Sequence, residues 1–222
     1  METMRPLTSL AAGFFLLLAL IVVLDIGLFQ LMPGDPIDEA DRDITRWMVD
    51  ARTPGLNSFM RGATTLGSAR LMWLVAGVAA GVTYRSARAR LLPLVPLVAM
   101  LGGAIMNNLG KALTDRPRPL IRPLVDPGGS SFPSGHATIA AVIFSALAIL
   151  IARGLSTRGK VAVWTATGAL IALVAVTRVY LGVHWPSDVV VGAATGVAWS
   201  LWCGRTLVPK ESAAGVNRYP AP

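Results

Sequence analysis

Residues 91–110 read LLPLVPLVAMLGGAIMNNLG and contain no charged side chain. A helix of about 20 apolar residues is long enough to cross the hydrocarbon core of a bilayer. Residues 7–31 form a second such run, which is interrupted only by Asp25. Charged residues make up only 14% of the whole chain, whereas soluble domains carry about 25%. The sequence therefore predicts an integral membrane protein.

The apolar runs predict an all-α fold, a bundle of six transmembrane helices. The expected spans are residues 7–31, 66–84, 91–110, 137–152, 161–177 and 189–204. The first run is too long for the core of a signal peptide and lacks a small-residue cleavage site, so we expect a retained signal anchor. The last three runs are short for a span and should extend into their polar flanks. We expect one domain over residues 1–208 and a disordered cytoplasmic tail over residues 209–222.

Two short connections predict the orientation of the chain. They carry basic residues and no acidic ones: Arg85, Arg88 and Arg90 after the second span, and Arg153, Arg158 and Lys160 after the fourth. Such loops are typically cytoplasmic. We expect the protein in the inner (plasma) membrane, with both chain ends in the cytoplasm. The first, third and fifth connections, and with them the active site, then lie on the extracytoplasmic side.

The first outer connection, residues 32–65, is acidic. It contains Asp35, Asp38, Glu39, Asp41, Asp43 and Asp50. Apolar side chains recur there at helical spacing, at Ile44, Trp47, Met48 and Ala51, and predict a short amphipathic helix on the outer membrane surface. We interpret the acids as a solvated face, in preference to a metal or substrate site.

The net charge of +8 does not indicate a nucleic-acid partner. The basic residues stand at the ends of apolar runs, where they determine topology. The single cysteine, Cys203, cannot form an internal disulfide and is expected to be a small packing residue. The expected partners are the bilayer and a lipid, and the sequence does not fix the oligomeric state.

The only two histidines, His136 and His184, each stand at the start of an expected span and therefore on the same membrane face. His136 ends the stretch Phe-Pro-Ser-Gly-His at residues 132–136. Proline and serine are typical of helix starts, and Gly135 allows close approach of backbone to a ligand. Unpaired N–H groups at a helix start suit an anion.

The second histidine lies in the stretch TRVYLGVHWPSD at residues 177–188. Pro186 is expected to be the first residue of the last helix, which makes Asp188 a first-turn acid. Its carboxylate can then reach back to one nitrogen of His184, fix the tautomer and leave the other nitrogen's lone pair free. It would also stabilise the positive charge that grows on an attacking imidazole.

The third stretch, KALTDRPRP at residues 111–119, follows the third span. Prolines on both sides of Arg118 stiffen its backbone. Lys111, Arg118 and Arg178 would supply three cations on the face that carries the histidines, and guanidinium groups match phosphate oxygens.

Together these stretches resemble the type-2 phosphatidic acid phosphatase (PAP2) superfamily. The family pattern is Lys-x6-Arg-Pro, then Pro-Ser-Gly-His, then Ser-Arg-x5-His-x3-Asp. It is matched in order over about residues 66–204, with one departure, Thr177 in place of the usual serine. Thr177 keeps a hydroxyl, so we expect little functional loss.

The resemblance implies a metal-independent lipid phosphatase without a cofactor. His184 would form a phosphohistidine, Asp188 would orient it, and His136 would act as general acid and base. Phosphate would be held by Lys111, Arg118, Ser134, Gly135 and Arg178. The first substrate expected is undecaprenyl pyrophosphate, followed by phosphatidylglycerol phosphate or phosphatidate.

Three alternatives remain open at this point. A lipid phosphotransferase would pass the same phosphohistidine to an acceptor lipid. A haloperoxidase-like use of the pocket would need bound vanadate, and six spans argue against it. A non-catalytic six-span transport or binding protein for phosphorylated lipids would not need the two histidines and Asp188.

Overall fold

A computed structural model of the protein describes residues 5–30, 36–86, 91–119, 121–126 and 128–208. Within these residues the fold is all-helical, as predicted. The elements are α1 (Arg5–Asp25), η2 (Ile26–Gln30), α2 (Pro36–Asp50), α3 (Pro54–Ala63), η3 (Thr64–Gly67), α4 (Ala69–Ser86), α5 (Leu94–Leu113), α6 (Gly135–Ile151), α7 (Thr157–Tyr180) and α8 (Pro186–Leu207). The expected tail over residues 209–222 lies outside the described residues.

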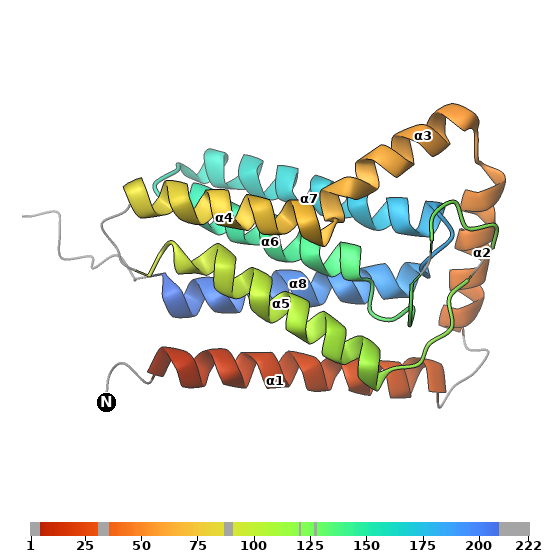
Figure 1. Ribbon diagram of the computed structural model, residues 1–222, viewed down its shortest axis with the longest axis horizontal. Coiled ribbons are helices and arrows are strands. Elements are labelled where there is room, and N and C mark those ends of the chain that lie inside the picture. Colours follow the sequence, from red (N-terminus) through yellow and green to blue (C-terminus); the bar gives the residue numbers. More distant parts are fainter. Residues whose placement is uncertain (1–4, 31–35, 87–90, 120, 127, 209–222) are drawn as a thin grey trace, which may run out of the picture.

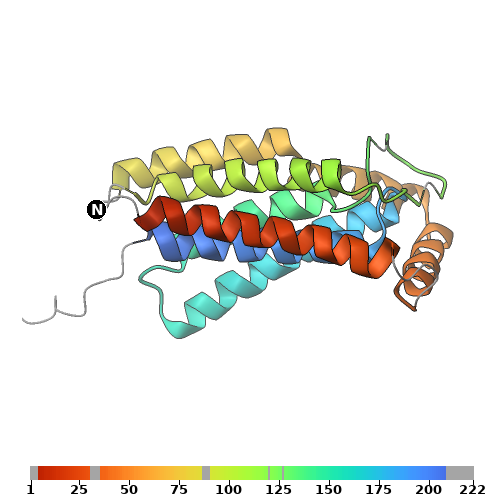
Figure 2. The same ribbon diagram turned by 90° about the horizontal axis from the view of Figure 1, so that it is seen from below.

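Six helices, α1 and α4 to α8, run along the long axis of the molecule, and α2 lies across one end (Figures 1 and 2). The helix α6 is central, because it packs against α4, α5, α7 and α8. Contact between α6 and α8 is close because Gly196 has no side chain. A Cβ atom there would lie 2.5 Å from the carbonyl oxygen of Thr138. Small residues at helix contacts are typical of membrane bundles.

Each predicted span overlaps one long helix, but the number of spans is not confirmed as six. By length and composition, three helices of the described chain qualify as membrane spans, namely α1, α5 and α7. A fourth is obtained if residues 54–67 and α4 form one broken span with a bend of 47°. The break follows the short helix η3, where Ser68 adopts an extended conformation. The apolar helix α6 is shorter than the other spans, at 17 residues.

The helix α2 appears where the acidic segment was expected to be helical. Its buried residues are Asp41, Thr45 and Val49. By contrast, Ile44 and Trp47 of the expected apolar stripe are 40% and 68% exposed. The face turned toward the bundle is thus the one that carries a carboxylate.

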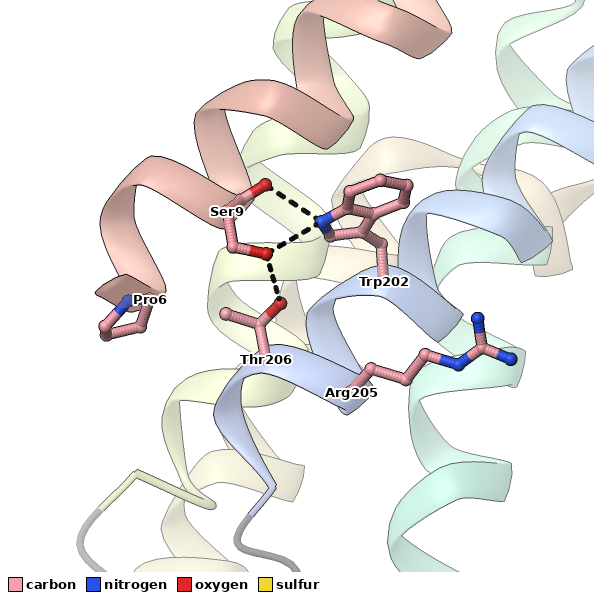
Figure 3. A pocket seen from close by; sticks show the side chains of 5 residues that line it. All are labelled: Pro6, Ser9, Trp202, Arg205 and Thr206. Atoms are coloured by element: carbon pink, nitrogen blue, oxygen red, sulfur yellow. Dashed lines mark hydrogen bonds between the residues drawn. The ribbon is translucent and has the colours of Figure 1, made fainter. Parts of the chain in front are cut away.

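The end of the bundle opposite α2 holds a pocket of about 450 Å³ between α1 and α8 (Figure 3). Trp202 donates to the Ser9 carbonyl at 2.9 Å and contacts the Ser9 hydroxyl at 3.2 Å. That hydroxyl lies 3.3 Å from Oγ1 of Thr206. These contacts attach α1 to α8, far from both histidines.

Candidate active site

The site residues predicted from the sequence gather at the end of the bundle that α2 crosses (Figure 1). They come from the last turns of α5 and α7, the first turns of α6 and α8, and the connections next to them. The residues are Lys111, Arg118, Ser134, Gly135, His136, Arg178, His184 and Asp188. Residues up to 77 positions apart in sequence thus meet through the antiparallel arrangement of the helices.

His184 and Asp188 face each other across the start of α8. Nδ1 of His184 lies 3.5 Å from Oδ2 of Asp188, which is longer than a formed hydrogen bond. The Asp188 carboxylate is fully buried and held in place by donors. Its Oδ2 accepts from the Trp185 backbone N–H at 2.8 Å and from the Ser131 hydroxyl. A shortening of about 0.5 Å would bring this pair to hydrogen-bond distance.

The other nitrogen of His184, Nε2, faces a cation. Nη1 of Arg118 lies 3.2 Å from it and also donates to the Val183 carbonyl at 2.5 Å. Since a guanidinium can only donate, Nε2 presents its lone pair, and the proton of a neutral ring sits on Nδ1 toward Asp188.

Burial keeps the ring of His184 neutral at pH 7. The pKa of His184 is lowered to about 4, chiefly by desolvation and also by Arg118 and Arg178, against the raising effect of Asp188. A neutral imidazole with an outward lone pair is the form that a nucleophile requires.

The segment 128–130 fixes the cations Lys111 and Arg118. Nζ of Lys111 donates to the Ser130 carbonyl at 2.6 Å. Arg118 donates to the carbonyls of Gly128, of Gly129 at 2.8 Å and of Ser130 at 3.1 Å. Gly129 has a φ of +62°, a backbone conformation that glycine adopts without a steric penalty. Both cations are therefore oriented before any anion binds.

The start of α6 lies directly against the start of α8. The backbone N–H of Ser134 donates to the Asp188 carbonyl at 3.1 Å. Within the described chain, the hydroxyl of Ser134 is buried and has no hydrogen-bond partner. Asn107 of α5 supports this helix start by donating to the Pro133 carbonyl at 3.3 Å. A hydroxyl and free helix N–H groups at this place suit an anion.

Arg178 and His136 complete the site. Nη1 of Arg178 donates to the Thr64 hydroxyl at 2.9 Å, whereas its buried Nε has no partner among the described residues. Electrostatic interactions act on His136 from Arg178, His184, Lys111 and Arg118. His136 therefore shares one electropositive site with the other predicted residues.

Several residues of this network were not predicted from the sequence. Arg116 binds Asp188 directly, and Asp41 of α2 binds Arg116. Ser131 donates a hydrogen bond to Asp188, and Thr64 accepts one from Arg178. For Arg116 a signal existed, because it precedes Pro117 in the same Arg-Pro-Arg-Pro stretch as Arg118.

Metal ligands do not gather in the described part of the chain. No group of three or more His, Cys, Asp or Glu side chains lies close enough there to hold a metal ion. The cations of Lys111, Arg118 and Arg178 are the charges available to a bound anion at this site.

Comparison with known proteins identifies the family. The PAP2 superfamily profile matches residues 92–210. This chain belongs to the PAP2 superfamily. It is 34% identical over 164 residues to phosphatidylglycerophosphatase B of Bacillus subtilis, a match covering 72% of this chain and 80% of that protein. It is 32% identical over 150 residues to decaprenylphosphoryl-5-phosphoribose phosphatase of Mycobacterium tuberculosis, covering 64% and 76% of the two chains.

A solved structure agrees with this assignment. The crystal structure of a transmembrane PAP2-type phosphatidylglycerolphosphate phosphatase from Bacillus subtilis superposes with a TM-score of 0.69 at 29% identity. The match covers 90% of this chain and 94% of that one. The protein is thus a membrane hydrolase of the PAP2 lipid phosphatase family, as the sequence motifs predicted.

Proposed function

We propose that this PAP2 protein removes a terminal phosphate from a membrane lipid through a phosphohistidine on His184. The observation that carries the proposal is the position of the buried His184 between Asp188 and Arg118. Asp188 favours the positive charge that the attacking ring acquires. Arg118 binds the phosphate that the ring attacks.

In the first step Nε2 of His184 attacks phosphorus and the bond from phosphorus to the lipid oxygen breaks. His136, which takes up a proton when the negatively charged phosphate binds beside it, donates this proton to the departing oxygen. The lipid leaves as an alcohol, or as a lipid monophosphate when the substrate is a pyrophosphate. Lys111, Arg118 and Arg178 neutralise charge on the non-bridging oxygens, with the Ser134 hydroxyl and the Gly135 N–H as further donors.

In the second step water attacks the phosphohistidine. His136, now neutral, accepts a proton from this water, while the bond from phosphorus to Nε2 breaks and inorganic phosphate forms. His184 returns to its neutral form with its proton on Nδ1 toward Asp188. The chain's own cations carry out the charge neutralisation, so we expect no requirement for a metal ion.

Phosphatidylglycerol phosphate is the first substrate to test, because the similar Bacillus subtilis protein and the similar Bacillus subtilis structure are both named for phosphatase activity on it. Undecaprenyl pyrophosphate, the first expectation from the sequence, comes second. A prenyl tail stays in consideration because a further relative is named for a decaprenyl-linked substrate. A phosphate-release panel over these lipids, phosphatidate and glucose 6-phosphate tests the proposal. Equal efficiency on soluble and lipid phosphates would contradict it.

The same panel separates hydrolysis from phosphotransfer. A phosphatase releases inorganic phosphate in stoichiometric amounts with the dephosphorylated lipid. A phosphotransferase would release little phosphate and convert an added acceptor lipid into its phosphorylated form.

For the membrane arrangement we propose six spans, α1 and α4 to α8, with the site and α2 on the outer surface of the inner membrane. The support is that α4 ends and α7 begins, next to the two short basic stretches of the sequence, at the other end of the bundle. A cysteine in place of exposed Asp43 should react with an impermeant thiol reagent in intact cells, and one in place of exposed Arg158 should not. The native Cys203 is buried and makes a low background. The reverse labelling would overturn this topology.

A further inference from the structure

The acidic helix α2 is attached to the start of α8 through Asp41, which is 3% exposed. Oδ1 of Asp41 accepts from the backbone N–H of Ser187 at 2.9 Å, and Oδ2 accepts from the Ser187 hydroxyl. The first N–H groups of a helix have no partner inside the helix, and a carboxylate there is favourable. Asp41 thus caps, from 146 residues away, the helix whose first turn contains Asp188 (Figure 1).

Arg116 joins Asp41 to Asp188. Its Nη1 donates to Oδ1 of Asp188 at 2.6 Å, and its Nη2 donates to Oδ2 of Asp41 at 2.7 Å and makes a longer contact of 3.5 Å with Oδ1 of Asp38. The guanidinium is buried, and its central carbon lies 3.4 Å from the centre of the Phe29 ring. The rigid fork therefore binds two carboxylates from separate elements at once.

From His184 outward, the charges of Asp188, Arg116 and Asp41 alternate in sign. Asp188 is negative, Arg116 positive and Asp41 negative. Without the charge of Asp41, Arg116 would keep on α2 only the longer pairing with Asp38, and its buried charge would offset more of that of Asp188. Asp188 would then stabilise less of the positive charge that develops on His184.

We propose that Asp41 and Arg116 are positioning residues for the His184–Asp188 pair, so that α2 belongs to the functional unit of the enzyme. This inference rests on the proposed phosphatase function. Asp41 does not contact His184. It acts by holding Arg116 and Ser187, which fix the place and the effective charge of Asp188.

The test compares two isosteric variants of the same helix, Asp41→Asn and Asp43→Asn. Asp43 is 78% exposed and pairs with Arg46 at 3.7 Å on the surface, so its replacement should change nothing measurable. For Asp41→Asn we expect kcat to fall about 10-fold to 100-fold, the range measured when a residue that orients a functional side chain without touching the substrate is replaced. KM on the lipid phosphate that the wild type hydrolyses fastest should stay within about 3-fold, because Asp41 is not among the phosphate-binding groups.

A double-mutant cycle shows whether Asp41 acts through Arg116. Arg116→Lys keeps the positive charge but cannot bind both carboxylates in the same way. In that background, Asp41→Asn should lower kcat by much less than it does in the wild type. Arg116→Lys by itself also tests the proposal if Asp41→Asn does not yield folded protein, and it should lower kcat at nearly unchanged KM.

The outcomes separate this inference from the proposed function. A wild-type protein that hydrolyses no lipid phosphate would overturn both. An active wild type with unchanged kcat in Asp41→Asn and in Arg116→Lys would overturn only the positioning role. Strictly additive losses in the double variant would also overturn it, as would a rise in KM without a fall in kcat.

Discussion

Replacing Asp188 by asparagine removes the charge next to His184 while keeping the shape of the side chain. The carboxylate accepts from Arg116 at Oδ1 and from Trp185 and Ser131 at Oδ2. An amide has only one oxygen, so its NH₂ group must face a donor on one side. The variant thus loses a charge and gains a donor–donor contact.

The size of the effect follows from the distance between Nδ1 of His184 and Oδ2, 3.5 Å. At an effective dielectric constant of about 20, a full charge pair at this separation interacts by roughly 5 kcal/mol. If the imidazole carries about half of its charge in the transition state, some 2.5 kcal/mol are lost, which corresponds to roughly 70-fold in kcat. The disturbed tautomer adds to this, and the aspartate of the serine protease triad sets an upper limit of about 10⁴-fold.

The assay is steady-state phosphate release from a lipid phosphate in detergent micelles. Asp115→Asn, at an exposed position at the same end of the bundle, serves as the matched control and should retain wild-type kcat. Thermal melting of each purified variant separates a catalytic loss from a loss of folded protein. A kcat of Asp188→Asn within about 3-fold of the wild type would refute the assigned role, since the charge argument alone requires more.

Three further predictions concern the two histidines and the absence of a metal requirement. His184→Ala should abolish turnover. His136→Ala, given a substrate with a good leaving group, should accumulate a phosphoenzyme that is stable to alkali and labile to acid. The absence of a labelled phosphoenzyme would contradict the proposed order of steps. Activity should persist in excess EDTA and be inhibited by vanadate, which resembles five-coordinate phosphorus; loss with EDTA and recovery with magnesium would instead direct attention to the acidic residues of α2. The folded-state pKa of His184 is about 4, against an ordinary value of 6.5, so the unfolded chain binds more protons than the folded chain between these pH values. The stability of the folded protein should therefore fall as the pH drops from about 6.5 toward 4. A wild-type melting temperature that falls no more steeply over this range than that of His184→Gln would contradict this.

The sequence was sufficient for the membrane class, the helical fold and the family. Apolar runs near the thickness of a bilayer can satisfy their backbone only as helices, so composition and length decide the secondary structure. The motif residues could also be recognised, because Lys111, His136 and His184 each stand at the end of an apolar run. Because an even number of expected spans separates His136 from His184, the two residues are expected on the same membrane face whatever the packing of the helices.

Helix boundaries and the face of α2 could not be obtained in this way. The second apolar run begins at Leu66, but the chain bends between η3 and α4. In α2 the spacing of Ile44 and Trp47 predicted an apolar face toward the membrane surface, but it gave no sign that Asp41 would be buried against the bundle. A carboxylate is buried when a partner compensates it, and that partner, Arg116, is 75 residues away.

The pairing of charges is therefore what only the tertiary structure decided. The sequence does not say which carboxylate or anion pairs with each of the cations Lys111, Arg116, Arg118 and Arg178. In the folded chain Arg116 is engaged by two buried carboxylates, whereas the Nε of Arg178 has no partner in the described structure. Which cation supports the catalytic aspartate and which faces an anion depends on distances of a few ångströms between elements that are remote in the chain. No local pattern encodes such distances, because they result from how α2 and the connection after α5 pack against the start of α8.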